Sequence, residues 1–167
     1  MTQWFAEMIS NPYLLVVILT FTPFLELRAS IPYGILVAHL DWLPVVALAI
    51  VANILLGPIL YFLLAKLLHV LLRVRPLRRL WDRAIVRTQK KIHPLVEKYG
   101  VYGLGFFIGV PLPGSGVYSG AMGGYLLGFT RREFYAATVL GVLIAAAAVT
   151  AVVLTGAKTF SLFIDAP

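Results

Sequence analysis

The sequence contains no cysteine, so disulfide bonds and thiolate metal sites are excluded from its structure and chemistry. Its three histidines lie far apart, at positions 39, 69 and 93, and do not suggest a metal site. Gly114-Ser115-Gly116 looks like the surroundings of a serine nucleophile, but no general base is expected near it in the apolar part of the chain. We therefore expect no metal, no cofactor and no enzymatic activity.

Charged residues are also scarce, because Asp, Glu, Lys and Arg make up only 13% of the 167 residues. Hydrophobic residues reach 60%, and the mean hydropathy is +0.91. These values lie outside the usual range of soluble domains. The composition therefore predicts an all-α integral membrane protein with one membrane domain.

The positive charges are concentrated in one part of the chain. Ten of the 14 Lys and Arg residues fall between Lys66 and Lys98, and Arg131 and Arg132 form a second group. Such clusters beside long apolar segments are typical of the cytoplasmic side of membrane proteins, whereas nucleic-acid binding needs a folded basic face. We expect residues 66–98 to be cytoplasmic, and we expect no nucleic-acid partner.

The N-terminus has Glu7 and no Lys or Arg before Ser10, so it lacks the basic region of a cleavable signal. The first apolar segment is therefore expected to remain in the protein. With the charge distribution, this predicts a multi-pass protein of the inner (cytoplasmic) membrane with both termini outside.

Two uncharged segments, 43–65 and 134–155, exceed the roughly 20 residues that cross a ~30 Å hydrocarbon core. They are predicted to be membrane-spanning helices. Asn53 and the pair Gly57-Pro58 interrupt the first segment, which we interpret as a packing kink with one interhelical hydrogen bond.

Two other apolar segments are interrupted near their middle. In the first, Glu26-Leu27-Arg28 separates arms of 13 and 12 residues, and in the second the sequence PLPGSG occupies 111–116. Arms of this length cross about half a bilayer, and two prolines with two glycines end a helix. Both segments are predicted to be re-entrant hairpins, with a kinked single span as the alternative for the first.

The charge rule supports the second hairpin, because a hairpin returns Arg131 and Arg132 to the cytoplasm and a single crossing would not. The chain is then two inverted-topology repeats, each a re-entrant helical hairpin plus a transmembrane helix. The repeats cover 1–65 and 99–167, joined by a cytoplasmic linker at 66–98. Inverted repeats place a transport site near the midplane, where the broken segments meet.

Residues 73–92 predict a basic amphipathic helix within this linker. One face carries Leu77, Trp81, Ala84 and Thr88, and Lys and Arg cover the opposite face. A helix of this kind lies on the cytoplasmic leaflet and binds anionic lipid, so membrane lipids are expected partners.

Glu26 and Arg28 are the strongest candidate functional residues. A charge at the bilayer centre costs at least ~2.5–3.5 kcal/mol, so an ionisable residue there is a functional hypothesis by default. The alternative is that the two side chains neutralise one another at a hairpin tip near the interface. Residues two apart on a helix point to different faces, which argues against that alternative if the tip is helical.

Helix N-termini could complete an anion site. Ser30 is a predicted N-cap, with Pro32 in the first turn of the helix that follows, and Ser115 or Gly116 would begin the corresponding helix of the second hairpin. With Arg28, two such N-termini facing one another would bind an anion. The candidate substrate and proton site is Glu26, Arg28, Ser30, Pro32, Pro111, Pro113, Gly114, Ser115, Gly116 and Tyr118.

Glycines recur at intervals of four residues in the second half of the chain. They are Gly105 and Gly109, and then Gly116, Gly120, Gly124 and Gly128. Such stripes allow another helix to approach closely. Together with the small size of the chain, they predict a homodimer.

The segments 26–34, ELRASIPYG, and 110–121, VPLPGSGVYSGA, resemble the paired motifs of the putative small multidrug export protein family. That family has Thr where Ser115 stands and Trp where Tyr118 stands. The arrangement is also similar to the DedA group of re-entrant-hairpin carriers linked to flipping polyprenyl phosphates or phospholipids. DedA proteins carry acidic residues and Arg in both hairpins, whereas here only the first hairpin has them.

We therefore expect a transporter of an amphiphilic, anionic substrate such as a lipid phosphate, with Arg28 on the headgroup and Glu26 exchanging protons. One alternative is an exporter of small lipophilic cations, in which Glu26 binds both the substrate and the proton. Another is a membrane organiser that does not transport and that binds anionic lipid through residues 73–92.

Overall fold

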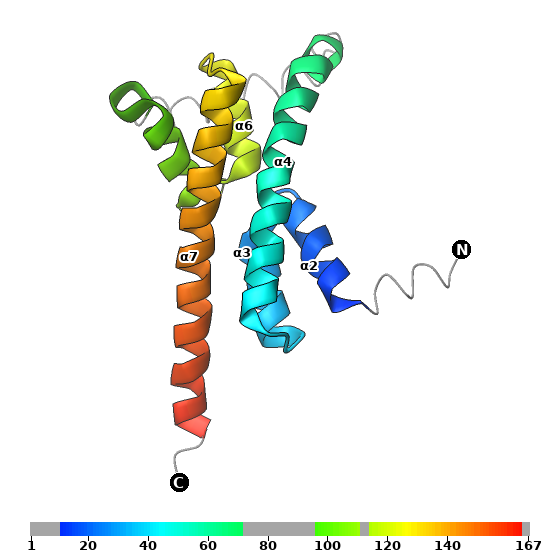
Figure 1. Cartoon of the computed structure of the whole chain (residues 1–167), viewed down its shortest axis with the longest axis vertical. Coiled ribbons are helices and arrows are strands. Elements are labelled where there is room, and N and C mark those ends of the chain that lie inside the picture. The colour runs from blue at the N-terminus through cyan, green and yellow to red at the C-terminus, as the bar shows by residue number, and fades with distance from the viewer. Residues whose placement is uncertain (1–10, 72–95, 111–113, 165–167) are drawn as a thin grey trace, which may run out of the picture. The chain divides into compact units, whose positions relative to one another are not determined.

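The structure is a computed structural model that describes residues 11–71, 96–110 and 114–164 (Figure 1). All regular secondary structure in these ranges is helical. The elements are α2 (Pro12–Phe21), α3 (Glu26–Pro32), the π-helix η1 (Tyr33–Val37), α4 (Trp42–Leu71), α6 (Val117–Leu126) and α7 (Arg131–Ile164). A further helical segment covers 96–109. The predicted linker helix at 73–92, and Pro111 and Pro113, lie outside the described residues.

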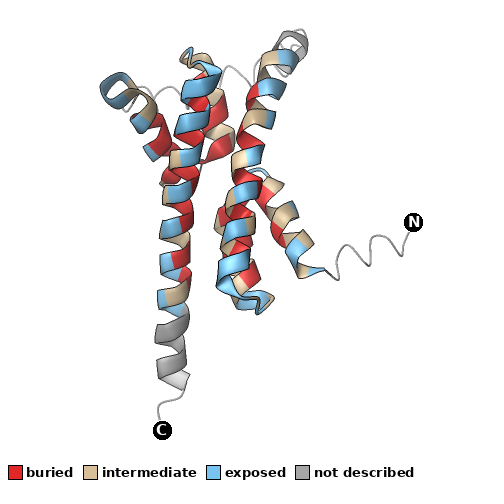
Figure 2. Cartoon of the chain, viewed as in Figure 1, coloured by how far each residue is buried: buried red, intermediate tan, exposed pale blue. Residues whose placement is uncertain are grey.

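Helices α4 and α7 confirm the two predicted long apolar helices. Their stretches Trp42–Lys66 and Arg131–Gly156 have mean hydropathies of 2.4 and 2.5 and are long enough to cross a membrane. Only 33% and 44% of the most apolar part of each is buried inside the protein (Figure 2). Long helices that expose so much apolar surface are suited to lipid rather than to water.

The chain divides into two compact units, each of which contains parts of both long helices. The first unit consists of Met1–Asn53 with Ala145–Pro167, and the second of Ile54–Ile144. Among the described residues, the first unit therefore contains α2, α3 and η1, and the second contains 96–109 and α6. Each unit thus has its own pair of short helical arms.

In the first unit, α2 packs against α3 and η1 as a helical hairpin. Asn11 begins α2, because its side chain accepts hydrogen bonds from the backbone N–H groups of Tyr13 (3.1 Å) and Leu14 (3.4 Å). Gly34 of η1 lies against the next helix, since a Cβ there would lie 2.6 Å from Cγ1 of Val45. At a rise of about 1.5 Å per residue, the ten residues of α2 extend about 15 Å, half of a hydrocarbon core.

In the second unit, the segment 96–109 packs against α7 through glycines on both helices. A Cβ at Gly105 would lie 3.2 Å from the carbonyl oxygen of Ala137, and one at Gly141 would lie 2.6 Å from the carbonyl oxygen of Gly105. A Cβ at Gly109 would lie 2.8 Å from Cβ of Ile144 in α7. The close approach predicted for Gly105 and Gly109 is therefore confirmed, and Gly141 completes it from the opposite helix.

The second hairpin joins 96–109 to α6. Gly120 of α6 lies directly against Ile108, and a Cβ at Gly124 would lie 3.2 Å from Cδ2 of Leu104. The other two members of the predicted stripe have a different role, because Gly116 and Gly128 adopt φ angles of +119° and +77° just outside the ends of α6. Glycine adopts such angles without steric cost, and the Cβ position of Gly128 has nothing within 4 Å.

The same unit is held together around the start of α7. Thr130 and Glu133 form a reciprocal cap, in which the Thr130 N–H donates to Glu133 Oε2 (2.8 Å) and the Glu133 N–H donates to Thr130 Oγ1 (3.3 Å). Tyr61 of α4 donates a hydrogen bond to the Phe129 carbonyl oxygen, and its ring stacks on Phe134 with centroids 5.0 Å apart. These contacts fix the end of the second hairpin against α4 and α7.

Two features of α4 bear on the predicted kink. The helix continues through Gly57 and Pro58, and a Cβ at Gly57 would lie 2.8 Å from Cγ2 of Thr138, so Gly57 allows close helix packing as predicted. Asn53 is only 1% exposed, but its Oδ1 has no hydrogen-bond partner among the described residues. The predicted interhelical hydrogen bond is therefore not made by this oxygen.

We expect Gly120→Ala to lower the free energy of unfolding by about 1–3 kcal/mol, because the new methyl group overlaps the Ile108 side chain. Gly156→Ala is the matched control, since it lies in α7 with nothing within 4 Å of its Cβ position. That control should be neutral or stabilising by up to about 1 kcal/mol, because alanine favours helix more than glycine. Thermal unfolding in detergent measures both changes, and equal effects would show that Gly120 is not a packing contact.

Candidate functional site

Glu26 lies at the turn between α2 and α3, where it is the first residue of α3. It is only 3% exposed, and its φ of +49° places it in the left-handed region of the backbone. Phe24, two residues earlier, has a φ of +70°. Such conformations cost a non-glycine residue roughly 1–3 kcal/mol and are found preferentially at functional sites. A buried, strained carboxylate is therefore located where the sequence predicted the site.

Arg28 forms an ion pair with Glu26, in which Nη1 and Oε2 lie 3.9 Å apart. The two side chains meet although residues two apart on a helix point to different faces. The side chain of Arg28 keeps 16% exposure, whereas that of Glu26 keeps 3%. The Arg28 side chain is therefore the more accessible member of the pair.

The predicted N-cap role of Ser30 is wrong. Helix α3 begins at Glu26, its N-cap position is Leu25 without a side-chain cap, and Ser30 is an interior residue. The Thr20 hydroxyl instead hydrogen-bonds the Ser30 hydroxyl at 2.7 Å and the Val16 carbonyl oxygen at 2.8 Å, which joins α2 to α3. The left-handed backbone at Glu26 lets the helix start earlier than the sequence indicated, so no helix N-terminus at Ser30 contributes to anion binding.

Pro32 also lies elsewhere than predicted, because it is the last residue of α3 rather than part of a first turn. A proline has no N–H to donate within the helix, and the π-helix η1 follows directly, closed by a hydrogen bond from the Ala38 N–H to the Tyr33 carbonyl oxygen (2.9 Å). Short π-helical segments of this kind are frequent at functional sites.

The second hairpin supplies the remaining described candidates. Gly116 is the N-cap of α6, which confirms one of the two predicted helix starts, and Tyr118 lies in the first turn. Ser115 is buried and donates a hydrogen bond to the Val110 carbonyl oxygen, which closes the turn. Gly114 has a φ of +79°. These residues belong to the second unit, and their meeting with Glu26 and Arg28 stays a prediction.

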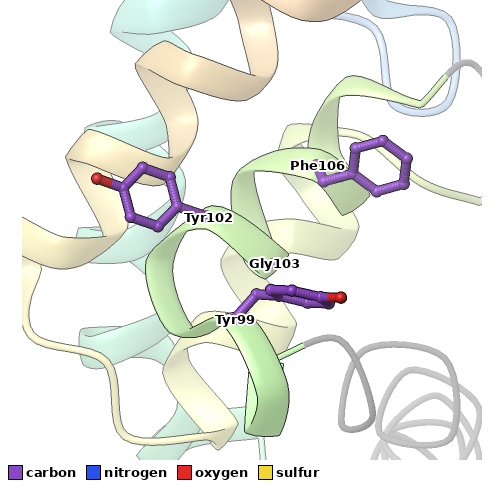
Figure 3. Close-up of a pocket in the computed structure, with 4 residues that line it drawn as sticks. All are labelled: Tyr99, Tyr102, Gly103 and Phe106. Atoms are coloured by element: carbon purple, nitrogen blue, oxygen red, sulfur yellow. The ribbon is translucent and has the colours of Figure 1, made fainter.

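An aromatic groove in the second unit was missed by the sequence reading (Figure 3). It has a volume of about 420 Å³ and is lined by Tyr99, Tyr102, Gly103 and Phe106. The rings recur at intervals of three and four residues along 96–109 and are 53%, 75% and 53% exposed. Helical spacing of Tyr99, Tyr102 and Phe106 was the signal that could have revealed it.

One ring of the aromatic groove, that of Tyr99, lies close to a positively charged side chain of the same helix. The Lys98 ammonium lies 5.1 Å from the centroid of the Tyr99 ring, within the range of a cation–π interaction. Among the residues that the structure describes, those lining the groove are three aromatic residues and Gly103, and none of the four is charged.

A comparison with protein families shows which family this chain belongs to. The family model described as "Putative small multi-drug export protein" matches residues 26–148. The chain belongs to this family. The match begins at Glu26 and includes both motifs, so the predicted family is confirmed, whereas similarity to the DedA group stays a prediction. No curated protein and no solved structure matches the chain.

Membership of the small multi-drug export family, together with α4 and α7, places this protein in a membrane. The matched region contains the Glu26–Arg28 pair, the turn at Ser115 and the aromatic groove. Each is therefore located in the part of the chain that defines the family.

We expect Arg28→Ala to destabilise this family member by about 3 kcal/mol, because it leaves the buried Glu26 carboxylate without its positive partner. The double variant Glu26→Gln with Arg28→Ala should recover part of that loss, since the amide carries no charge. A double-mutant cycle on unfolding in detergent measures the coupling. Strictly additive effects would mean that the 3.9 Å pair contributes nothing to stability.

Proposed function

We propose that the protein is a membrane transporter of amphiphilic substrates with an anionic, lipid-phosphate-like headgroup. Membership of a family described as small multi-drug export proteins supports export across a membrane. In this proposal the first hairpin binds the headgroup at Arg28, and lipid surrounds the apolar tail along the exposed faces of α4 and α7.

The observation that carries the choice of an anion is the unequal exposure of the ion pair. A ligand that approaches the turn meets the Arg28 side chain, which is 16% exposed, before the Glu26 side chain, which is 3% exposed. Guanidinium is planar and presents paired N–H donors that match phosphate and carboxylate oxygens. Glu26 then holds the guanidinium in place and exchanges a proton when the headgroup binds or leaves.

The proposed architecture is a pair of inverted, re-entrant hairpins. The arms α2 and α6 each contain ten residues and extend about 15 Å, which is too short to cross a hydrocarbon core. In this arrangement the linker at 66–98 is cytoplasmic, both termini lie outside, and two copies assemble through their exposed apolar helix faces. Such an arrangement is typical of carriers with alternating access.

Thermal shift of the purified protein in detergent tests the anionic substrate. We expect a polyprenyl phosphate to raise the melting temperature, with a stabilisation of about 2.7 kcal/mol at a concentration of about 100 Kd. The matching polyprenol, which lacks the phosphate, should have no such effect. Arg28→Ala should abolish the shift, and Arg28→Lys should retain only part of it because the fork geometry is lost.

Arg131→Ala is the control variant, because this arginine is exposed at the start of α7 and removing it makes the same change in net charge. It should bind the phosphate like the wild type. An equal loss in Arg131→Ala and Arg28→Ala would indicate binding to overall positive charge and would contradict the proposal.

The aromatic groove favours a second candidate function, the export of lipophilic cations. Aromatic rings attract organic cations by about 0.5–2 kcal/mol each, and the buried Glu26 carboxylate would neutralise the cation during transport. In that case the groove at Tyr99, Tyr102 and Phe106 is an entry position and Glu26 is the transport position.

We expect tetraphenylphosphonium to quench the tyrosine and tryptophan fluorescence of wild-type protein if this second function holds. Tyr102→Leu should weaken its binding by about tenfold, because a 75% exposed ring is replaced by a smaller apolar side chain without a π face. Tyr135→Leu, another exposed tyrosine outside the groove, is the control. Binding that is the same in both variants would exclude the groove. A protein that binds neither the phosphate nor the cation would fit the non-transporting membrane organiser.

A further inference from the structure

Asn53 is a polar side chain that the proposed function does not use. It lies in the middle of α4, is 1% exposed, and its Oδ1 has no hydrogen-bond partner among the described residues. An isolated buried carbonyl oxygen costs roughly 1–3 kcal/mol relative to one that is hydrogen-bonded. Such an atom in a membrane helix requires an explanation, and a bound ion, proton or water would provide one.

The position of Asn53 follows from the packing of the first unit. The segment α3–η1 and helix α4 are joined by only the residues 38–41, so they run in opposite directions. Their contact is fixed by Gly34, because a Cβ there would lie 2.6 Å from Cγ1 of Val45. The register of the two helices is obtained by counting from this contact backward along α3 and forward along α4.

Two buried stripes face one another in this register. Along α3–η1 the stripe is Glu26, Ser30 and Gly34, and along α4 it is Val45, Ala49 and Asn53, each with a spacing of four residues. Residues four apart form the ridges through which helices pack. With Gly34 opposite Val45, Ser30 falls opposite Ala49 and Glu26 falls opposite Asn53.

The geometry points to a site for a small cation between the Glu26 carboxylate and Asn53 Oδ1. Both groups are hydrogen-bond acceptors, so they attract a cation or a proton placed between them. As the proton site, protonated Glu26 donates its O–H to Asn53 Oδ1. As a sodium site, the ion is coordinated by both oxygens, in the manner of coupling ions at the broken helices of carriers.

The described parts of α2, η1 and α4 up to Asn53 carry few titratable groups. Arg28 is the charged group paired with it, α2 contributes Tyr13 as its only titratable residue, η1 contributes Tyr33, and α4 has none between Trp42 and Asn53. The inference rests on the proposed function, because it assigns Glu26 as the coupling group, and it adds Asn53 as the second oxygen ligand.

The test is the thermal stability of purified full-length protein in detergent without substrate. One series replaces choline by sodium at constant ionic strength and pH, and a second series varies pH without sodium. We expect the wild-type melting temperature to respond to sodium in the first case or to protons in the second. In Asn53→Leu the apparent affinity for that cation should fall by about tenfold or more, as in Glu26→Gln.

Matched variants separate a ligand from a structural residue. Asn53→Leu should be as stable as the wild type without cation, because it removes an unsatisfied oxygen at similar volume. Thr150→Val removes another buried oxygen without a described partner, in α7, and should keep the wild-type cation response. Asn53→Asp retains the shape and should strengthen the response, which also tests the site if Asn53→Leu does not fold.

A wild-type cation response in Asn53→Leu would overturn the inference, as would the absence of any response in the wild type. Phosphate binding through Arg28 with no cation response would leave the proposed function standing and remove the coupling site. A cation response lost in Asn53→Leu, without phosphate binding, would retain the site and remove the anionic substrate.

Discussion

Helices in this protein pack through direct contact with residues that have almost no side chain, and the rest of the structure depends on that contact. Lipid is as apolar as the helices themselves, so no hydrophobic force drives helices together inside a membrane. Gly34 meets Val45 in the first unit, and Gly105 and Gly141 bring two backbones together in the second. These contacts fix the register of each hairpin against a long helix and so determine which polar side chains come together.

The Glu26–Arg28 pair shows how the chain keeps charge inside an apolar structure. Full charges are expensive to bury, and pairing lowers that cost without removing the electric field of either group. The pairing occurs at a residue with a left-handed backbone, so backbone strain is found at the same position. Strain, burial and charge coincide at Glu26, and this combination is the basis for proposing the first turn as the site.

The sequence predicted the long helices and the broken segments because their causes are local. Length and apolarity identify α4 and α7, and Gly116 beside Ser115 begins α6 as its N-cap. The spacing of Gly105 and Gly109 likewise predicted a close helix contact. Family membership followed from motifs at the same breaks. The aromatic groove was visible as a spacing of three and four residues but was not recognised as a surface.

What the sequence alone determined is the class of the protein: a small helical membrane protein of the multi-drug export family with charge at its first break. Only the tertiary structure decided which groups are partners. The Thr20–Ser30 hydrogen bond, the pairing of Glu26 with Arg28 and the lone oxygen of Asn53 depend on the turn between α2 and α3 and on contacts between separate helices. Periodicity describes the faces of a single helix, and it contains no information about which face of another helix lies opposite.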